Sequence, residues 1–216
     1  MSTRRWDKHF FATTRGRIVA LLRQQARTVD ELARSLGLTD NAVRAHLTTL
    51  ERDGLVERAG LRPGPSKPSY DYDLTAETEH LFSRAYPPVL DALLAELLDR
   101  DGIEAVEALL QSTGKRLAQA HPPAGDTKKR LAQGTMVLNE LGGLAETETN
   151  GDQVCIRGYS CPLASITGKH PAVCLGVATL LSEVVGIPMR EACDRSGRPR
   201  CCFYGMLEPE SMEQTG

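Results

Sequence analysis

The feature that most constrains the fold is a short break between two helical sequence patterns in the first quarter of the chain. The first pattern, Val29–Leu36, follows Thr28, a residue that can cap a helix, and Glu31 completes a capping box three residues later. A four-residue turn, Gly37–Asp40, leads to a second pattern that ends near Asp53, with the threonine or the aspartate of the turn as N-cap. The sequence therefore predicts two helices joined by a tight turn.

A third helix is expected ahead of these two, over residues 14–25, because apolar side chains recur there at helical spacing. On the last helix, Val43, Leu47 and Leu50 are four and then three residues apart, so they share one face and can pack on the other two helices. The pattern is typical of a helix-turn-helix. The alternative is an ordinary three-helix core with a solvated outer face.

A hairpin is expected directly after these helices. A short strand at residues 55–58 is followed by a Gly/Pro-rich tip at residues 62–68, and then Tyr70, Tyr72 and Leu74 alternate as in a second strand. The tip cannot pack a core, but it can present basic side chains to phosphates or to a minor groove. The hairpin is the wing of a winged helix-turn-helix.

The charge distribution and the polar face of the last helix indicate a DNA-binding surface. Residues 1–70 hold 13 Lys and Arg against 7 Asp and Glu, a net charge of +6, whereas the other 146 residues hold 13 against 21, a net charge of −8. Residues near the start of a recognition helix usually reach base edges, and hydroxyl side chains suit phosphates. We predict base contacts for Asn41, Arg44 and Ala45, contacts nearer the backbone for His46, Thr48 and Thr49, and wing contacts for Arg62 and Lys67.

This region resembles the winged-helix repressors related to the ArsR and DeoR groups over roughly residues 14–75. The matching motifs are Ala42–Leu47, Leu50-Glu51, Asp53–Val56 and Tyr72–Thr75. Such proteins commonly carry Gly-Arg-Pro in the wing, whereas this chain has Gly64–Pro68, in which Lys67 takes the place of the arginine.

Two leucine-rich helices are expected in the middle of the chain, in a segment taken as 81–125. Their periodic runs cover residues 89–98 and 103–117, with a break at Asp101-Gly102, and residues 121–125 form a linker. Helix-turn-helix proteins usually bind two half-sites as dimers, so these helices could pair between subunits. Packing within one subunit fits the leucine pattern equally well.

All six cysteines lie in the last 62 residues and none in the first 154. Disulfides are rare in a reducing cytoplasm, so the cluster indicates a metal or redox site. This third part, residues 126–216, should be a small α+β module: a helix over residues 127–141, a turn at Asn150-Gly151 and a returning strand at residues 154–156. Cys155 lies in that strand and is expected to be a buried structural thiol.

Four of these thiols lie at loop ends and could converge on one soft metal. Tetrahedral thiolate sites hold iron-sulfur clusters or zinc, and the spacing here does not choose between them. Cys202 adjoins Cys201, and neighbouring strand residues point to opposite faces, so only one of the two should bind. For His170 a role in the loop or beside the ligands is favoured, and ligation is the alternative. The candidate ligands are Cys161, Cys174, Cys193 and Cys201.

The cysteine region also resembles the iron-sulfur-sensing repressors of the suf assembly operon. The matching residues are Cys161-Pro162, His170–Cys174, Gly186–Pro188, Cys193, Gly197, Cys201 and Phe203. The resemblance implies a homodimer with one cluster per subunit, 4Fe-4S rather than 2Fe-2S, that represses cluster-assembly genes when loaded. It also implies Cys161, Cys174 and Cys201 as ligands, with Cys193 as the fourth.

The fold class expected is therefore mainly α with small β: a winged helix-turn-helix at residues 1–80, central helices, and the cysteine-rich module. An enzyme is not expected, because the sequence has no evident catalytic base, phosphate loop or nucleophile elbow. No stretch approaches the roughly 18 apolar residues of a membrane helix, and residues 1–6 lack the apolar core of a signal peptide, so the protein is expected in the cytoplasm.

Three hypotheses follow. The first is the iron-sulfur-controlled DNA-binding repressor. The second is a winged-helix regulator that senses zinc or thiol oxidation through the same cysteines, with Cys201 paired to Cys202 or Cys193 in a disulfide. The third is a thiol enzyme or cluster carrier with a head that only looks like a DNA-binding domain.

Overall fold

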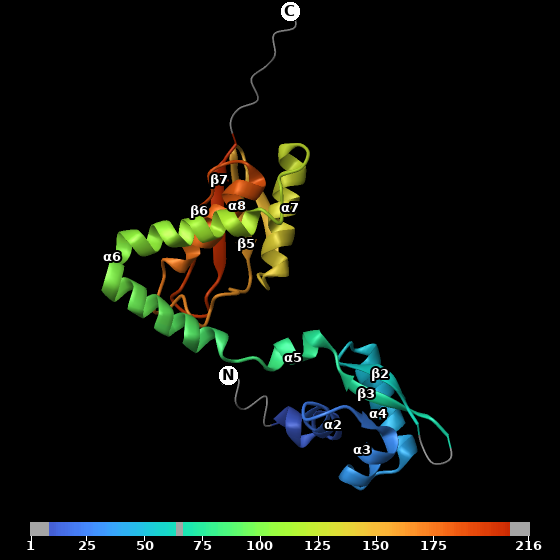
Figure 1. Cartoon of the computed structure of the whole chain (residues 1–216). Coiled ribbons are helices and arrows are strands. Elements are labelled where there is room, and N and C mark those ends of the chain that lie inside the picture. The colour runs from blue at the N-terminus through green and yellow to red at the C-terminus, as the bar shows by residue number, and fades with distance from the viewer. Residues whose placement is uncertain (1–8, 64–66, 208–216) are drawn as a thin grey trace, which may run out of the picture. The chain divides into compact units, whose positions relative to one another are not determined.

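The computed structural model describes residues 9–63 and 67–207. The chain divides into two compact units, Met1–Arg84 and Ala85–Gly216. Both are built from helices with one small antiparallel sheet, which confirms the predicted fold class (Figure 1). None of the helices in the described part of the chain is long and apolar enough to cross a lipid bilayer.

The first unit is a winged helix-turn-helix. Helices α2 (Thr14–Leu22), α3 (Val29–Leu36) and α4 (Asp40–Arg52) precede a hairpin, and a short helix follows it. The other elements are β1 (Arg27–Thr28), β2 (Val56–Arg62), β3 (Ser69–Leu74) and α5 (Ala76–Phe82). The strand order is β1-β3-β2, so the residues just before α3 add a third strand to the predicted hairpin. Neither β1 nor α5 was predicted.

Local signals set the helix boundaries as expected. The Thr28 hydroxyl accepts the Glu31 N–H at 3.3 Å, and the Glu31 carboxylate accepts the Thr28 N–H at 2.8 Å, so the capping box is complete. Gly37 ends α3 in the left-handed conformation at φ 68°, and Thr39 caps α4. The predicted stripe on α4 is buried: Val43, Leu47 and Leu50 pack in one core with α2, α3 and the hairpin.

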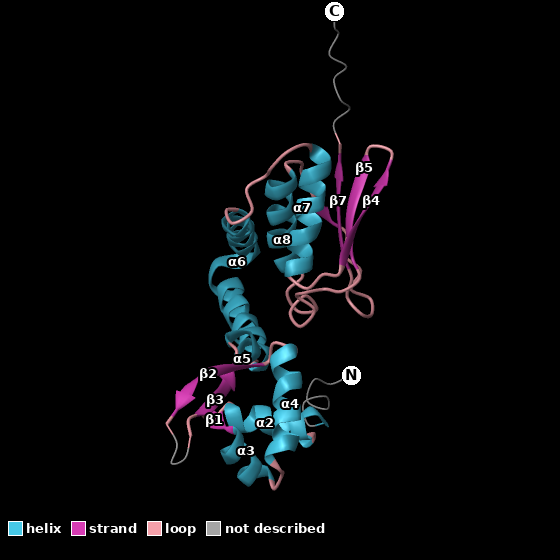
Figure 2. Ribbon diagram, turned by 90° about the vertical axis from the view of Figure 1, so that its right-hand side faces the viewer, coloured by secondary structure: helices cyan, strands magenta, loops and turns pink. Residues whose placement is uncertain are grey.

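The second unit is a helix-covered four-stranded sheet. Its elements are α6 (Tyr86–Ala118), α7 (Thr127–Glu140), β4 (Ala145–Asn150), β5 (Gln153–Gly158), α8 (Val173–Val185), β6 (Arg190–Glu191) and β7 (Cys201–Met206). The strands run antiparallel in the order β4-β5-β7-β6. Figure 2 shows α7 and α8 on one face of this sheet, and no element of the described residues covers the other face.

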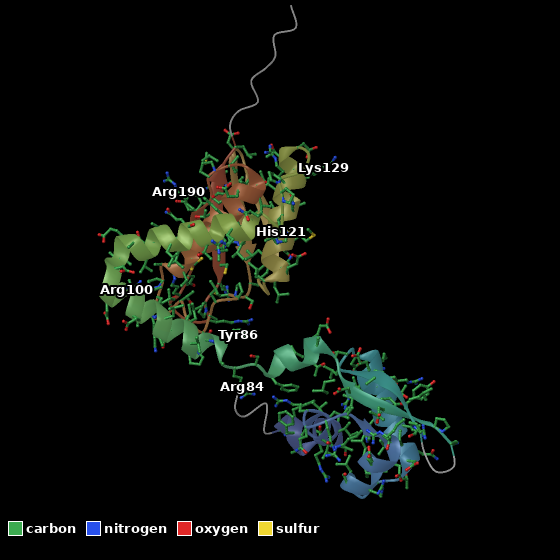
Figure 3. All side chains as sticks on the ribbon, viewed as in Figure 1. Arg84, Tyr86, Arg100, His121, Lys129 and Arg190 are labelled. Atoms are coloured by element: carbon green, nitrogen blue, oxygen red, sulfur yellow. The ribbon has the colours of Figure 1, made fainter. Side chains whose placement is uncertain are left out.

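The predicted break in the central helices is confirmed. Gly102 has φ 81° and ψ 172°, which are not helical values, and α6 bends sharply at this residue (Figure 1). The bend lies just after Arg100, which is labelled in Figure 3. The buried side of the leucine stripe packs within the subunit, because Leu94 and Val106 of α6 share a core with Val173 of α8. The other side of α6 leaves large apolar side chains exposed: Tyr86, Val89, Leu93, Ile103, Leu109 and Leu117.

Two details of the cysteine module differ from the prediction. Asn150 pairs with Gln153, so the hairpin turns at Gly151-Asp152, one residue later than expected, with Gly151 at φ 59°. The predicted burial of Cys155 is wrong. Val154 and Ile156 are buried under the helices, and the alternation of the strand points Cys155 to the uncovered face, where it is half-buried.

Candidate nucleic-acid interface and candidate metal centre

The exposed face of α4 carries the residues predicted to contact DNA. Asn41, Arg44, Ala45 and Thr48 are exposed, whereas His46 and Thr49 are half-buried toward the edge of this face. The opposite face is fixed by the buried stripe, so the orientation of the polar side chains follows from the core. That these side chains contact DNA stays a prediction.

The two threonine hydroxyls of α4 are already engaged. Thr48 donates to the Arg44 carbonyl oxygen at 2.9 Å, and Thr49 donates to that of Ala45 at 3.1 Å. In this geometry each hydroxyl can still accept a hydrogen bond, but a phosphate oxygen needs a donor. Either hydroxyl must therefore leave its helix carbonyl before it can contact the DNA backbone.

A groove of ≈ 600 Å³ lies between the helices and the hairpin of the first unit. Its charged lining residues are four basic and three acidic ones: Arg34, Arg44, Arg62 and Lys67 against Asp30, Glu31 and Asp40. Lys67 is exposed in the predicted wing tip. Cations gathered in a concave surface favour the binding of a polyanion. The predicted wing tip falls partly on residues 64–66, which lie outside the described residues.

Arg62 has partners within the first unit. Its guanidinium lies 2.7 Å from a carboxylate oxygen of Glu31 and 2.7 Å from one of Asp71. The hydrogen bond to Asp71 contributes most to a raised pKa of Arg62, and Glu31 raises it further. The pKa of the Glu31 carboxyl is lowered, first by the Thr28 N–H and then by Arg62. Arg62 thus links the wing to the start of α3, and its predicted DNA contact would compete with these ion pairs.

Three thiols of the second unit converge, and we call Cys174, Cys193 and Cys201 the inner thiols. Cys174 lies at the start of α8, Cys193 follows β6, and Cys201 begins β7. The Cys193 thiol lies close enough to both of the others that each of them shifts its pKa, and Cys193 and Cys201 pack in the same core. The Glu191 carboxylate joins them, because one of its oxygens and the sulfur atoms of Cys174 and Cys193 all lie within 4.8 Å of one another.

Two of the inner thiols, Cys174 and Cys193, have raised pKa values. The Cys193 thiol, followed by burial, raises the pKa of Cys174. Cys174 lowers the pKa of Cys193, but the Cys201 thiol and burial outweigh it and raise that pKa to about 12. Arg195 donates to Glu191 at 2.7 Å and partly offsets the rise in the pKa of Cys174, so one cation lies beside the group. A soft metal ion displaces such protons because it binds the thiolate form.

The other predicted ligands lie apart from this group. Cys161 is half-buried and packs against the same core as Cys193 and Cys201. Like Cys201 it lies outside the group within 4.8 Å of one another, and unlike Cys201 it is not a cause of the pKa shift of Cys193. His170 is turned toward α6, where its Nε2 lies 3.0 Å from an Asp91 carboxylate oxygen. Its Nδ1 has no hydrogen-bond partner within the described part of the chain. His170 therefore ties the cysteine loop to α6.

The sequence did not predict that Glu191 and Arg195 lie beside the inner thiols. Glu191 belongs to a two-residue strand that pairs with β7 opposite Phe203, and this long-range pairing brings its carboxylate to the thiols. Cys202 lies on the outer face with its sulfur 3.1 Å from that of Cys155, as strand alternation requires for a neighbour of the buried Cys201. The donor set of three thiols and one carboxylate fits a soft metal centre.

Comparison with known proteins bears on the first unit. Residues 13–58 match the model of the bacterial regulatory protein, arsR family. No curated protein matches the chain. Among solved structures, the crystal structure of a mutant of MepR from a multidrug-resistant S. aureus clinical isolate is 21% identical, covers 50% of this chain and 78% of that chain, and has a TM-score of 0.29. Residues 13–58 are therefore similar in sequence to the helix-turn-helix domain of the arsR family of bacterial regulatory proteins.

Proposed function

We propose that this chain, with its arsR-type helix-turn-helix, is a repressor of iron-sulfur cluster assembly genes, controlled by a cluster bound to Cys161, Cys174, Cys193 and Cys201. The observation that carries the proposal is the convergence of the inner thiols from three separate elements of the second unit. Core packing alone does not require several cysteine side chains to lie close to one another. The resemblance of the cysteine motifs to the suf repressors supports the choice of cluster.

The surroundings of the inner thiols suit an anionic metal centre. A bound cluster, 4Fe-4S or 2Fe-2S, would supply an iron-sulfide core whose thiolate ligands carry net negative charge. Arg195 lies beside Cys174 and would offset part of that charge. Cys161 lies at the rim of the same core and would supply the fourth thiolate.

Control of DNA binding requires a path from the thiols to the dimer. Cys174 begins α8, and α8 packs against the second half of α6 so tightly that the helix backbones touch at Gly114 and Gly176. A change in the position of Cys174 is therefore passed to α6. If two dimer geometries differ in their affinity for metal, occupancy of the site shifts their populations and with them the affinity for DNA.

The proposed dimer would use the exposed side of α6. Tyr86, Val89 and Leu93 are spaced three and four residues apart, so they form one stripe, and their exposed fractions are 67%, 62% and 53%. An exposed apolar stripe of this kind is typical of a helix that pairs with another copy. A homodimer would present two recognition helices to a palindromic operator.

One observation favours a second candidate, a zinc-sensing regulator. The Glu191 carboxylate lies with Cys174 and Cys193. Zinc accepts mixed sulfur and oxygen ligands in four-coordinate sites. In that case Cys174, Glu191, Cys193 and Cys201 would bind the ion, and Cys161 would have no part in it.

Anaerobic purification followed by iron, sulfide and zinc analysis tests the proposal. We expect a brown protein that contains iron and sulfide, and we expect Ser at position 161, 174, 193 or 201 to lower the iron content strongly. Cys202→Ser is the matched control, because Cys202 neighbours Cys201 on the opposite face, and it should retain the iron. A colourless, zinc-containing protein that loses its metal on Glu191→Ala but not on Cys161→Ser would show that the zinc candidate is correct.

A further inference from the structure

The outer face of the second unit's sheet carries a thiol pair that the metal centre does not use. Cys155 of β5 and Cys202 of β7 are both half-buried, and their sulfur atoms are 3.1 Å apart. Strand alternation places both on the outer face, because their neighbours along the strands are the residues that face α7 and α8; Figure 2 shows these two helices on the inner face of the sheet. Their strand neighbours on the inner face are buried: Val154, Ile156, Cys201 and Phe203.

We propose that Cys155 and Cys202 are a modification site, at which a hydroperoxide forms a reversible disulfide on the outer face of the sheet. The register places Cys155 opposite Tyr204 and Cys202 opposite Arg157, so the two cysteines are diagonal neighbours on adjacent strands. A disulfide bond is about 2.05 Å long. The sulfur atoms therefore need to approach by only about 1 Å, which side-chain rotation and a small strand shift can provide.

Competing disulfides are disfavoured by the same geometry. Cys193 interacts with the main chain of Cys202, whose N–H lies 3.5 Å from the Cys193 sulfur, and not with its side chain. Cys201 is next to Cys202 but faces the opposite side of the strand. Within the described residues, Cys155 is thus the thiol that the side chain of Cys202 meets.

A cation stands beside the pair. Arg157 donates from Nε to a Glu148 carboxylate oxygen at 2.9 Å. Glu148 is the first cause of the raised pKa of Arg157, and both thiols add to it, so the guanidinium lies near both sulfur atoms. Burial, followed by the Cys202 thiol, raises the pKa of Cys155 to about 12, and Arg157 offsets only part of this shift. The short distance between the two sulfur atoms, rather than an activated thiol, therefore favours the disulfide.

The reaction is balanced with the hydroperoxide as oxidant. One thiol attacks the peroxide oxygen, the O–O bond breaks, and a sulfenic acid and one molecule of alcohol, or of water from hydrogen peroxide, are formed. The second thiol attacks the sulfenic sulfur, forms the S–S bond and releases water. Two electrons pass from the thiols to the peroxide, and a dithiol reductant reverses the step.

Peptide mapping of the full chain tests the proposal. The reduced protein is treated with hydrogen peroxide, free thiols are alkylated, and the digest is analysed by mass spectrometry. We expect a linked peptide that contains Cys155 and Cys202, lighter by two hydrogen atoms than its two parts together, which disappears after reduction. A link from Cys202 to Cys193 or Cys201, or full alkylation of Cys155 after peroxide treatment, would overturn the proposal.

Single variants give a second, independent readout. Cys155→Ser and Cys202→Ser should each abolish the linked peptide, and the remaining outer cysteine should instead be trapped as a sulfenic acid by a dione reagent. The peptide map of the wild-type chain tests the disulfide even if a variant fails to fold. The test does not depend on the metal centre, because neither cysteine belongs to the inner thiols.

Discussion

Gly114 of α6 and Gly176 of α8 bring two helix backbones into direct contact. A Cβ atom on Gly114 would lie 2.2 Å from the Gly176 carbonyl oxygen, much closer than two such atoms can approach. Gly176 lies two residues after Cys174, so this crossing fixes the position of an inner thiol relative to α6. The spacing of the leucines in α6 gave no sign of this contact.

Gly114→Ala should therefore destabilise the second unit. The added methyl group meets backbone that cannot rotate away, so α6 and α8 must separate, at a cost of about 2 kcal/mol in the free energy of unfolding. Urea unfolding followed by circular dichroism measures the change. Gly168→Ala is the matched control, since a Cβ there would meet nothing within 4 Å. Equal stability of the two variants would contradict the close packing.

Glu31 should make the stability of α3 depend on pH. Its pKa is lowered in the folded state by the Thr28 N–H and by Arg62, so its contribution is present above the ordinary value of 4.5 and is lost as the pH falls through the folded pKa. Glu31→Gln retains an acceptor for the capping box but removes the ion pair with Arg62, at a cost of about 0.5 kcal/mol at pH 7.

Hydrogen exchange of the α3 amides in the full chain measures this dependence. The difference between the wild type and Glu31→Gln should shrink as the pH falls below 4.5. Glu31→Ala, which also removes the capping box, should cost about 1 kcal/mol more. A difference between the wild type and the Gln variant that does not change with pH would show that the ion pair has no role.

Arg44→Ala should weaken operator binding and relax the preference for one base. Arg44 is exposed on α4 and lines the groove of the first unit, a position from which arginine commonly reads guanine. We expect a loss of about 10- to 100-fold, corresponding to roughly 1–3 kcal/mol. Titration of an operator selected from random DNA checks this. Arg100→Ala, which removes an exposed arginine of α6 paired with Asp101, should leave the affinity unchanged.

Leu93→Lys should convert the protein to a monomer. Leu93 is 53% exposed in the stripe of α6, and two buried ammonium groups across a symmetric interface would repel each other. Sedimentation velocity at the concentration where the wild type is a dimer gives the answer. Met206→Lys is the control, because Met206 is similarly exposed, at 58%, on the sheet. A dimeric Leu93 variant would place the interface elsewhere.

Features that depend on neighbouring residues could be predicted from the sequence. The capping box of Thr28 and Glu31, the end of α3 at Gly37 and the bend at Gly102 each follow from local conformational preference. The period of the apolar residues also predicted the core face of α4. The position of Cys155 could have been predicted from the alternation of β5, in which Val154 and Ile156 are the apolar neighbours.

Features that depend on long-range packing could not be predicted. Glu191 reaches the inner thiols only because β6 pairs with β7, and a two-residue strand has no sequence signature. Arg62 was expected at the DNA, but Asp71 and Glu31 are brought to it by the hairpin and by α3. His170 is a similar case, since its partner Asp91 is 79 residues away in the sequence.

The central claim is that the metal centre controls DNA binding, and one measurement tests it most directly. The affinity of a single anaerobic preparation for a palindromic operator is determined before and after the metal is removed by chelation. Coupling between two sites typically amounts to 1–3 kcal/mol, so we predict that the loaded protein binds the operator about 10- to 100-fold more tightly. Equal affinity of the loaded and the stripped protein would contradict the account.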